Sequence, residues 1–196
     1  MGEAALRVPS FEELYRRIVE LPQGMTGEIL EPGTLRTMSR PGGLHRRSAR
    51  RSLRALRAWD VDEGGHGWWF EVEAEIRLLG DRLAVPDLAG WRVANVPEFI
   101  DDNPISVVPD WCCEVLSPTT TRDDRRLKLP LYAKAGVGWI WLVDPELRMV
   151  EVFQTRDGLA TFVLGAQEDE QVLLMPFDAP IALGAWWHGE AGAGTR

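Results

Sequence analysis

Two acidic residues lie within or directly after short apolar runs of the kind that form buried strands. Asp87 follows residues 83–86 (Leu-Ala-Val-Pro), and Glu114 interrupts residues 111–116 (Trp-Cys-Cys-Glu-Val-Leu). Burying a carboxylate in a strand core is unfavourable unless a cation neutralises it. We therefore expect Asp87 and Glu114 to bind a divalent metal; the alternative is that both are merely buried and hydrogen-bonded.

Composition limits the class of protein. The chain has 196 residues, 45% of them hydrophobic, which fits one domain that can bury a sizeable core without staples. The formal net charge of -8 suits a soluble protein and does not by itself indicate a nucleic-acid partner. Cys112 and Cys113 are adjacent, without a metal-binding spacing, and we interpret them as buried strand residues.

No targeting or membrane segment is evident in the sequence. No apolar run reaches about 18 residues, and the first residues lack the charged-then-apolar pattern of a secretion signal. We therefore expect a cytoplasmic protein with no membrane partner.

The first part of the chain predicts a helix and then two strands. Ser10 and Glu13 have the spacing of a capping box, which predicts an N-terminal helix segment over residues 1–25. Two short strands then flank the turn Pro32-Gly33-Thr34. Glu28, in the first of them, is expected at the mouth of a sheet as an exposed strand-end acid. The main domain is expected over residues 26–188, and a frayed C-terminal tail over residues 189–196.

Residues 44–59 predict a helix with a basic face. At about 100° per residue its arginines fall within roughly 140° of one another, and its apolar residues take a different face. An arginine fork suits phosphate oxygens, so this face is a candidate nucleic-acid-binding surface; the alternative is a solvated face that pairs with acids elsewhere. We expect His45, which opens the helix, to be a cap or a surface residue. The arginines are Arg46, Arg47, Arg50, Arg51, Arg54 and Arg57.

The middle of the chain predicts a hairpin that ends at Asp87. Residues 68–79 are rich in aromatic and branched side chains, with acids at every second position from 71 to 75, as in a half-buried strand. Gly80-Asp81 predicts a tight turn into a second strand over residues 82–88, near whose end Asp87 lies. Residues 90–109 are expected to form a surface excursion.

After Glu114 the sequence predicts a helix and further strands. Three threonines and two aspartates begin the helix, which is expected to run to Ala135 with Gly136 as its C′ residue. Lys128 and Tyr132 share a face at the i, i+4 spacing. Pro130 is expected either to kink the helix or to show that its first turn begins later than we place it. Strands are expected near residues 138–143, 149–154, 160–164, 171–175 and 181–183. This order of elements favours an α/β fold with a sheet of mixed direction.

The candidate chemistry is that of a hard cation with a lysine nearby. Two carboxylates can hold Mg²⁺ through oxygen ligands, and the metal can lower the pKa of a bound water. A lysine can orient that water or hold a phosphate. The sequence has no Gly-rich phosphate loop, no GxSxG elbow and no zinc-site spacing.

Several motifs follow one another through the centre of the chain: Pro86-Asp87, Glu114-Val115-Leu116-Ser117-Pro118, Asp124-Arg125 with Lys128 and Tyr132, Gly136-Val137, and Trp141-Leu142-Val143-Asp144-Pro145. Together they resemble the bacterial Uma-two family of restriction-endonuclease-like proteins, within the PD-(D/E)xK nuclease superfamily. The resemblance covers roughly residues 10–187. Gly27-Glu28-Ile29-Leu30, followed by a helix that opens with a histidine, is also similar to the family's N-terminal pattern.

The resemblance implies a restriction-endonuclease-like α/β domain, a mixed sheet flanked by helices, with a Mg²⁺-dependent phosphodiesterase site that could also take Mn²⁺. Asp87 and Glu114 would be metal ligands and catalytic residues, with the backbone carbonyl of Val115 as a further ligand and Glu28 as a third acid. In the superfamily pattern a lysine stands two residues after the second acid, where this chain has Leu116. Lys128 would supply the amine from the next helix.

We therefore expect a metal-dependent endonuclease that cleaves DNA, with a homodimer possible. A second hypothesis is an inactive member of the fold that acts as a nucleic-acid or protein-binding module, which Leu116 favours. A third is an acidic body that binds a protein partner and no DNA.

Overall fold

Two apolar runs form the centre of the molecule as neighbouring parallel strands. They are β7 (Trp111–Val115) and β8 (Trp139–Asp144), with Glu114 in register with Leu142. Every residue of β7 is buried, as expected for a strand covered on both faces. The computed structural model describes residues 7–39, 42–168 and 170–188 of the chain.

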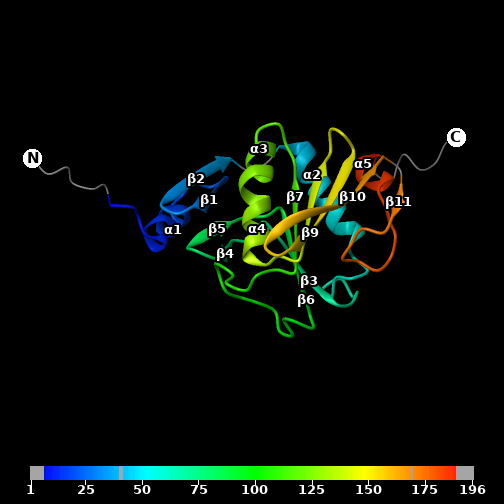
Figure 1. Cartoon of the computed structure of the whole chain (residues 1–196), viewed down its shortest axis with the longest axis horizontal. Helices are drawn as coiled ribbons and strands as arrows, with labels where there is room; N and C mark the ends of the chain where they lie inside the picture. The colour runs from blue at the N-terminus through cyan, green and yellow to red at the C-terminus, as the bar shows by residue number, and fades with distance from the viewer. Residues whose placement is uncertain (1–6, 40–41, 169, 189–196) are drawn as a thin grey trace, which may run out of the picture.

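These two strands belong to a six-stranded sheet in the order β10-β9-β8-β7-β6-β3 (Figure 1). All its neighbouring pairs are antiparallel except β7 with β8, so the sheet is of mixed direction, as the sequence predicted. The other four strands are β3 (Trp68–Val72), β6 (Leu88–Arg92), β9 (Met149–Arg156) and β10 (Leu159–Gln167).

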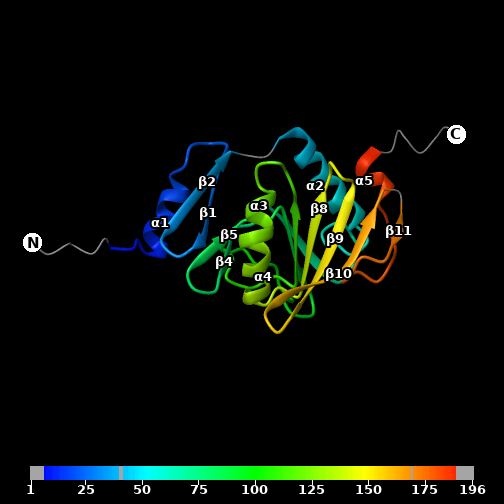
Figure 2. The same cartoon turned by 45° about the horizontal axis from the view of Figure 1, so that its top comes forward.

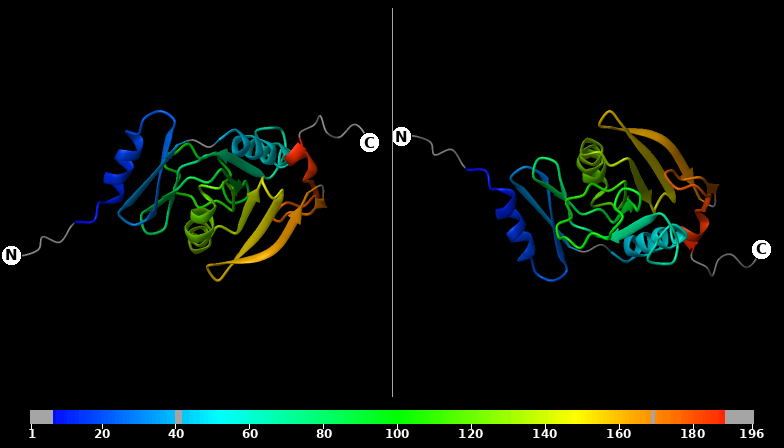
Figure 3. Two further views of the ribbon diagram at one scale, coloured as in Figure 1. Left: turned by 90° about the horizontal axis from the view of Figure 1, so that it is seen from above. Right: turned by 90° about the horizontal axis from the view of Figure 1, so that it is seen from below.

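Helices cover both faces of this sheet (Figure 3). On one face, Cys113 and Val115 share a core with Ala49 of α2 (Gly43–Ala55) and with Trp186 of α5 (Gly184–His188). On the other face, Cys112 packs with residues of a helix made of α3 (Thr121–Asp123), the π-helical turn η1 (Asp124–Lys128) and α4 (Leu129–Ala135). The α/β class with flanking helices is thus confirmed.

Aromatic rings fill the core on the α2 face. The Phe177 ring is 1% exposed, and its centroid lies 5.0 to 5.9 Å from five other rings, within the range of favourable ring contacts. Since these rings come from the α2–β3 connection and from three strands, Phe177 ties distant segments together. The five rings belong to Trp59, Trp68, Phe70, Trp111 and Trp141.

A second, four-stranded sheet stands beside the first, in the order β2-β1-β5-β4 (Figure 2). Its strands are β1 (Met25–Glu31), β2 (Thr34–Ser39), β4 (Ile76–Leu78) and β5 (Arg82–Ala84). Helix α1 (Phe11–Val19) packs on it through one apolar face. The capping box of Ser10 and Glu13 is present, which confirms the predicted helix start. A short pair, β11 (Gln171–Val172) and β12 (Ile181–Ala182), completes the described strands.

The strand predicted over residues 68–79 is wrong as a single element. It divides into β3 and β4, which belong to different sheets, and Glu73 at the break has a left-handed backbone with φ 53°. Val72, on the side of the predicted strand opposite the acids, is 51% exposed. The chain has to bend here because its two halves pair with different partners.

The second strand of the predicted hairpin is divided in the same way. Strand β5 ends at Ala84 and β6 begins at Leu88, so Asp87 lies in the connection between the two sheets, directly before the first residue of β6. Residues 88–92, expected in part to be a surface excursion, form a buried strand paired with β3 and β7. The Gly80-Asp81 turn between β4 and β5 is confirmed.

Two helices differ in part from their predicted bounds and caps. Helix α2 ends at Ala55, four residues before the predicted end. Thr120 is the N-cap residue of α3 but makes no side-chain cap; its N–H instead donates to Ser117 Oγ at 3.3 Å. Pro130 stands at the start of α4 directly after η1, whose wider turn accommodates a residue without an N–H. Gly136 is left-handed, as predicted for a C′ residue.

Within the described residues, no helix is long and apolar enough to cross a membrane. The predicted tail over residues 189–196 lies outside the described part of the chain.

The ring cluster yields a stability prediction. We expect Phe177→Ala to lower the free energy of unfolding by about 3 to 5 kcal/mol, because a large cavity replaces a ring packed on all sides. The matched control is Phe162→Ala on β10, where the side chain is 57% exposed and the expected loss is below about 1 kcal/mol. Urea unfolding followed by tryptophan fluorescence measures both. Equal losses would show that Phe177 does not hold the core.

Candidate active site

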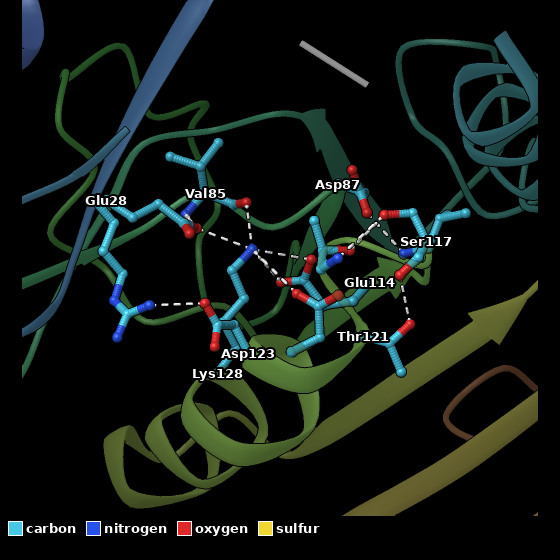
Figure 4. Close-up of polar contacts among 12 residues, drawn as sticks. Glu28, Val85, Asp87, Glu114, Ser117, Thr121, Asp123 and Lys128 are labelled. Carbon is cyan, nitrogen blue, oxygen red and sulfur yellow. Dashed lines mark hydrogen bonds and ion pairs between the residues drawn. The ribbon is translucent and has the colours of Figure 1, made fainter. Parts of the chain in front are cut away.

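A cavity of about 660 Å³ opens between the N-terminal sheet and the start of the helix after β7. One wall comes from β1 and β2, and the other from residues 117–124. Arg36 of β2 reaches across to Asp123, with its Nη1 2.7 Å from Oδ2. The candidate residues Glu28, Asp87, Glu114 and Lys128 all line this cavity (Figure 4).

Lys128 lies at the centre of the site. Its Nζ is 3.1 Å from both carboxylate oxygens of Glu114 and 2.9 Å from Glu28 Oε1. It also donates to the carbonyl of Val85 at 3.1 Å and lies 3.9 Å from Asp124 Oδ1. The side chain is only 6% exposed, so the lysine is a buried cation surrounded by carboxylates and not a surface helix residue.

The structure thus brings a lysine to the second acid although the usual motif position holds Leu116. Leu116 is 2% exposed and belongs to the apolar core on the face of the sheet that α4 covers. Lys128 ends the π-helical turn η1, and its amine reaches Glu114 from the adjacent helix. Lys128 therefore lies beside Glu114, although the spacing of the two residues in the sequence did not by itself predict this contact.

Tyr132 completes the surroundings of Glu114. It lies one turn after Lys128, is fully buried, and donates its hydroxyl hydrogen to Glu114 Oε1 at 2.5 Å. Besides packing in the apolar core, Tyr132 supplies a second donor to the same carboxylate, because the i, i+4 spacing places both side chains on the helix face that meets β7.

Asp87 is held from two elements. Its Oδ2 accepts the backbone N–H of Val115 at 2.7 Å and lies 3.1 Å from His45 Nε2. The side chains of His45 and Asp87 are only 10% and 13% exposed. The expectation that His45 is a cap or a surface residue is therefore wrong: the helix N-cap is Gly42, and the histidine faces the cavity from the first turn of α2.

Glu28 is buried, which contradicts the expectation of an exposed strand-end acid. It is 1% exposed on β1, and its Oε1 accepts the N–H of Val85 at 2.8 Å in addition to the contact with Lys128. Its Oε2 is buried and has no hydrogen-bond partner among the described residues. The acid lies inside the site because the β1–β5 pairing brings the end of β5 beside it.

The charges of the site are strongly perturbed. Burial raises the pKa of Glu114 well above its usual value, against the opposing effect of Lys128. Burial alone would lower the pKa of Lys128, but the carboxylates of Glu114, Glu28 and Asp124 outweigh it and raise that pKa well above 10.5. Lys128 is therefore a permanent cation, and such shifts cluster at functional sites.

Two further groups carry shifted pKa values. Burial raises the pKa of Asp124 to about 6, although Lys128 and a hydrogen bond to Thr120 oppose it. Burial lowers the pKa of His45, but the carboxylate of Asp87 and the nearby backbone of Val115 raise it overall. The Val115 backbone, whose carbonyl is expected to be a metal ligand, therefore lies beside this histidine.

The donor set fits a hard divalent cation. Six carboxylates line the cavity against two permanent cations, and one buried carboxylate oxygen, Glu28 Oε2, lacks a partner among the described residues. Carboxylate and carbonyl oxygens are the ligands that Mg²⁺ and Mn²⁺ prefer. In the described residues no three acidic, histidine or cysteine side chains form a ready metal cluster. The ammonium of Lys128 lies where Glu28 and Glu114 converge.

The arginine helix begins beside the cavity and leads away from it. Arg46, Arg47 and Arg50 line, with Gly43, an open groove of about 450 Å³. Arg51 is different, because it donates to the carbonyls of Trp186 and Trp187 at 3.0 Å and so joins α2 to α5. Arg57 pairs with Glu63 at 3.4 Å, and Arg54 is also partnered.

The fold and the site define a restriction-endonuclease-like α/β protein. The chain belongs to the Uma2 family, since that family's model, described as "Putative restriction endonuclease", matches residues 11–181. Four solved chains also match, among them "a putative nuclease belonging to DUF820" from Anabaena variabilis, with 20% identity and a TM-score of 0.68. That alignment covers 91% of this chain and 98% of the other. A comparison with curated proteins gave no match.

The raised pKa of Asp124 makes stability depend on pH in a defined direction. The folded protein holds this proton up to pH of about 6, whereas the unfolded chain releases it near 3.8. The contribution of Asp124 to stability therefore falls as pH rises between these values and is constant above them. We expect the free energy of unfolding of Asp124→Asn, relative to the unchanged protein, to rise by about 2 to 3 kcal/mol from pH 4 to pH 7.

Urea unfolding at several pH values measures this difference. Asp102→Asn, at an exposed position, is the matched control and should show no comparable gain. A difference between Asp124→Asn and the unchanged protein that is flat across this range would contradict the prediction.

Proposed function

We propose that this protein is a divalent-metal-dependent endonuclease that hydrolyses phosphodiester bonds in DNA. The convergence of Asp87, Glu114, Glu28 and Lys128 in one cavity carries the proposal. The membership in a restriction-endonuclease-like family supports it.

Asp87 and Glu114 would hold Mg²⁺ or Mn²⁺, with the carbonyl of Val115 and the carboxylate of Glu28 as further oxygen donors. The bound metal would supply a Lewis acid that lowers the pKa of a water and offsets charge on the phosphate. An acidic cavity repels a phosphodiester until cations neutralise it, so the excess of carboxylates is consistent with a metal-loaded substrate complex.

Lys128 would act as a charged hydrogen-bond donor that orients the attacking water or holds a phosphate oxygen. The carboxylates around it raise its pKa, which favours the role of a charged donor over that of a general base. In the described structure its donors are directed to Glu28, Glu114 and the Val85 carbonyl. To contact substrate it would exchange one of these partners.

The arginines at the start of α2 would contact the DNA backbone. Arg46, Arg47 and Arg50 are exposed and line one groove beside the helix start, whereas Arg51 is bound to α5. Phosphate contacts of this kind add affinity without sequence preference.

A second candidate function is a binding module of the same fold without catalysis. The contacts of Lys128 are compatible with this function, since its donors are already satisfied by Glu28, Glu114 and the Val85 carbonyl in the described structure. Cleavage assays separate the two functions.

We expect Asp87→Asn and Glu114→Gln each to reduce nicking of supercoiled plasmid in Mn²⁺ by about 100-fold or more, because each removes a charged ligand. The matched control is Glu98→Gln, an exposed position outside the cavity, which should keep full activity. Circular dichroism establishes that each variant is folded. Unchanged nicking by both site variants would contradict the nuclease assignment, whereas retained DNA binding without any nicking by the unchanged protein would favour the binding module.

We expect the double change Arg46→Ala with Arg50→Ala to weaken DNA binding and to reduce the slope of log affinity against log salt by about 2. Fluorescence anisotropy over a salt series measures this slope. Arg16→Ala with Arg17→Ala removes the same charge from exposed positions on α1 and should leave the slope unchanged. If both pairs change the slope equally, α2 is not the DNA-contacting face.

A further inference from the structure

We infer that His45 is a positioning residue that fixes the carboxylate of Asp87 for metal binding. The inference rests on the proposed function and adds to it a residue from α2, outside the acid–lysine set. It is carried by three features of the site: the contact between the two side chains, their burial, and the second donor on the same oxygen.

The contact is specific to one oxygen of Asp87. His45 Nε2 lies 3.1 Å from Oδ2, and the Val115 N–H donates to that same Oδ2 at 2.7 Å. One contact comes from a helix and the other from β7, so the two together hold Oδ2 from two sides. Oδ1 makes no hydrogen bond or ion pair within the described part of the chain.

A carboxylate held in this way is suited to act through its free oxygen. Metal-binding carboxylates are commonly hydrogen-bonded by a neighbouring group, which reduces the cost of orienting them when the ion binds. Asp87 requires such support more than Glu114 does, because Asp87 lies in the connection before β6, where its carbonyl accepts one backbone bond from Glu73, whereas Glu114 lies inside the central strand β7. His45 provides that support across the cavity.

The position of His45 is not explained by the needs of its helix. Gly42 is the N-cap residue of α2, and no side-chain cap is present, so the histidine does not satisfy the helix start. Helix α2 is already attached through Ala49 in the core and through the bonds of Arg51 to α5. His45 Nδ1 is buried and has no partner among the described residues, a cost that a purely structural anchor would avoid.

The test compares His45→Leu with His45→Gln in the full chain. Leucine fills similar space without a donor, while glutamine keeps an N–H of comparable reach. We expect His45→Leu to weaken Mn²⁺ binding by about 10- to 100-fold, and His45→Gln to recover most of that loss. Electron paramagnetic resonance of free Mn²⁺ gives the affinity, and urea unfolding reports stability separately.

His66→Leu is the matched control, since this histidine lies in the exposed loop before β3 and should leave Mn²⁺ affinity unchanged. The inference is overturned if His45→Leu binds Mn²⁺ as tightly as the unchanged protein while Asp87→Asn does not; the nuclease proposal then stands. It is also overturned if His45→Gln is no better than His45→Leu. If the leucine variant does not fold, His45→Gln is compared with His45→Asn, whose shorter amide does not reach Oδ2. The glutamine variant should then bind Mn²⁺ more tightly than the asparagine variant, and equal affinities would overturn the inference.

If the unchanged protein binds no Mn²⁺ and cleaves no DNA, the proposed function fails and the inference fails with it. If it cleaves DNA and His45→Leu cleaves with the same kcat and the same Mn²⁺ dependence, only the inference fails. The two failures are therefore distinguishable.

Discussion

The arrangement of the site depends on one buried ammonium surrounded by carboxylates. Lys128 contacts Glu28 and Glu114 and lies near Asp124, and all four side chains are almost completely buried. Burying so many charges is unfavourable unless they compensate one another. The cluster therefore links β1, β7 and the helix after β7 into one unit, since removing Lys128 would leave its buried carboxylate partners uncompensated. Within this cluster the carboxyl groups outnumber the ammonium by three to one.

The sequence was informative where the signal is local. The apolar runs of β7 and β8, the capping box of α1 and the left-handed Gly136 depend on neighbouring residues only, and the structure has all of them. The division of the predicted hairpin between two sheets was missed, because strand partners are chosen by tertiary packing and not by alternation along the chain. For the same reason, part of β6 was predicted to be a surface excursion.

The site could be predicted in its acids but not in its full membership. Asp87 and Glu114 stand out because a carboxylate beside an apolar run is unusual. Lys128 ends the π-helical turn before α4 and reaches Glu114 from there, a placement that no residue spacing indicates. His45 and Asp124 were not assigned to the site, since each looks like an ordinary first-turn helix residue and only the fold turns it toward the cavity. The opening histidine of the helix was the one available signal.

The position of Glu28 has a consequence for how the chain can be divided. The first strand and helix look like an addition to a central sheet, and Figure 1 shows them at one end of the molecule. Yet Glu28 contributes one of the carboxylates around Lys128, and its other bond reaches the backbone at Val85. Residues 7–39 are therefore not a removable appendage: a minimal version of this domain has to begin before α1, or it loses one wall of the cavity around Lys128.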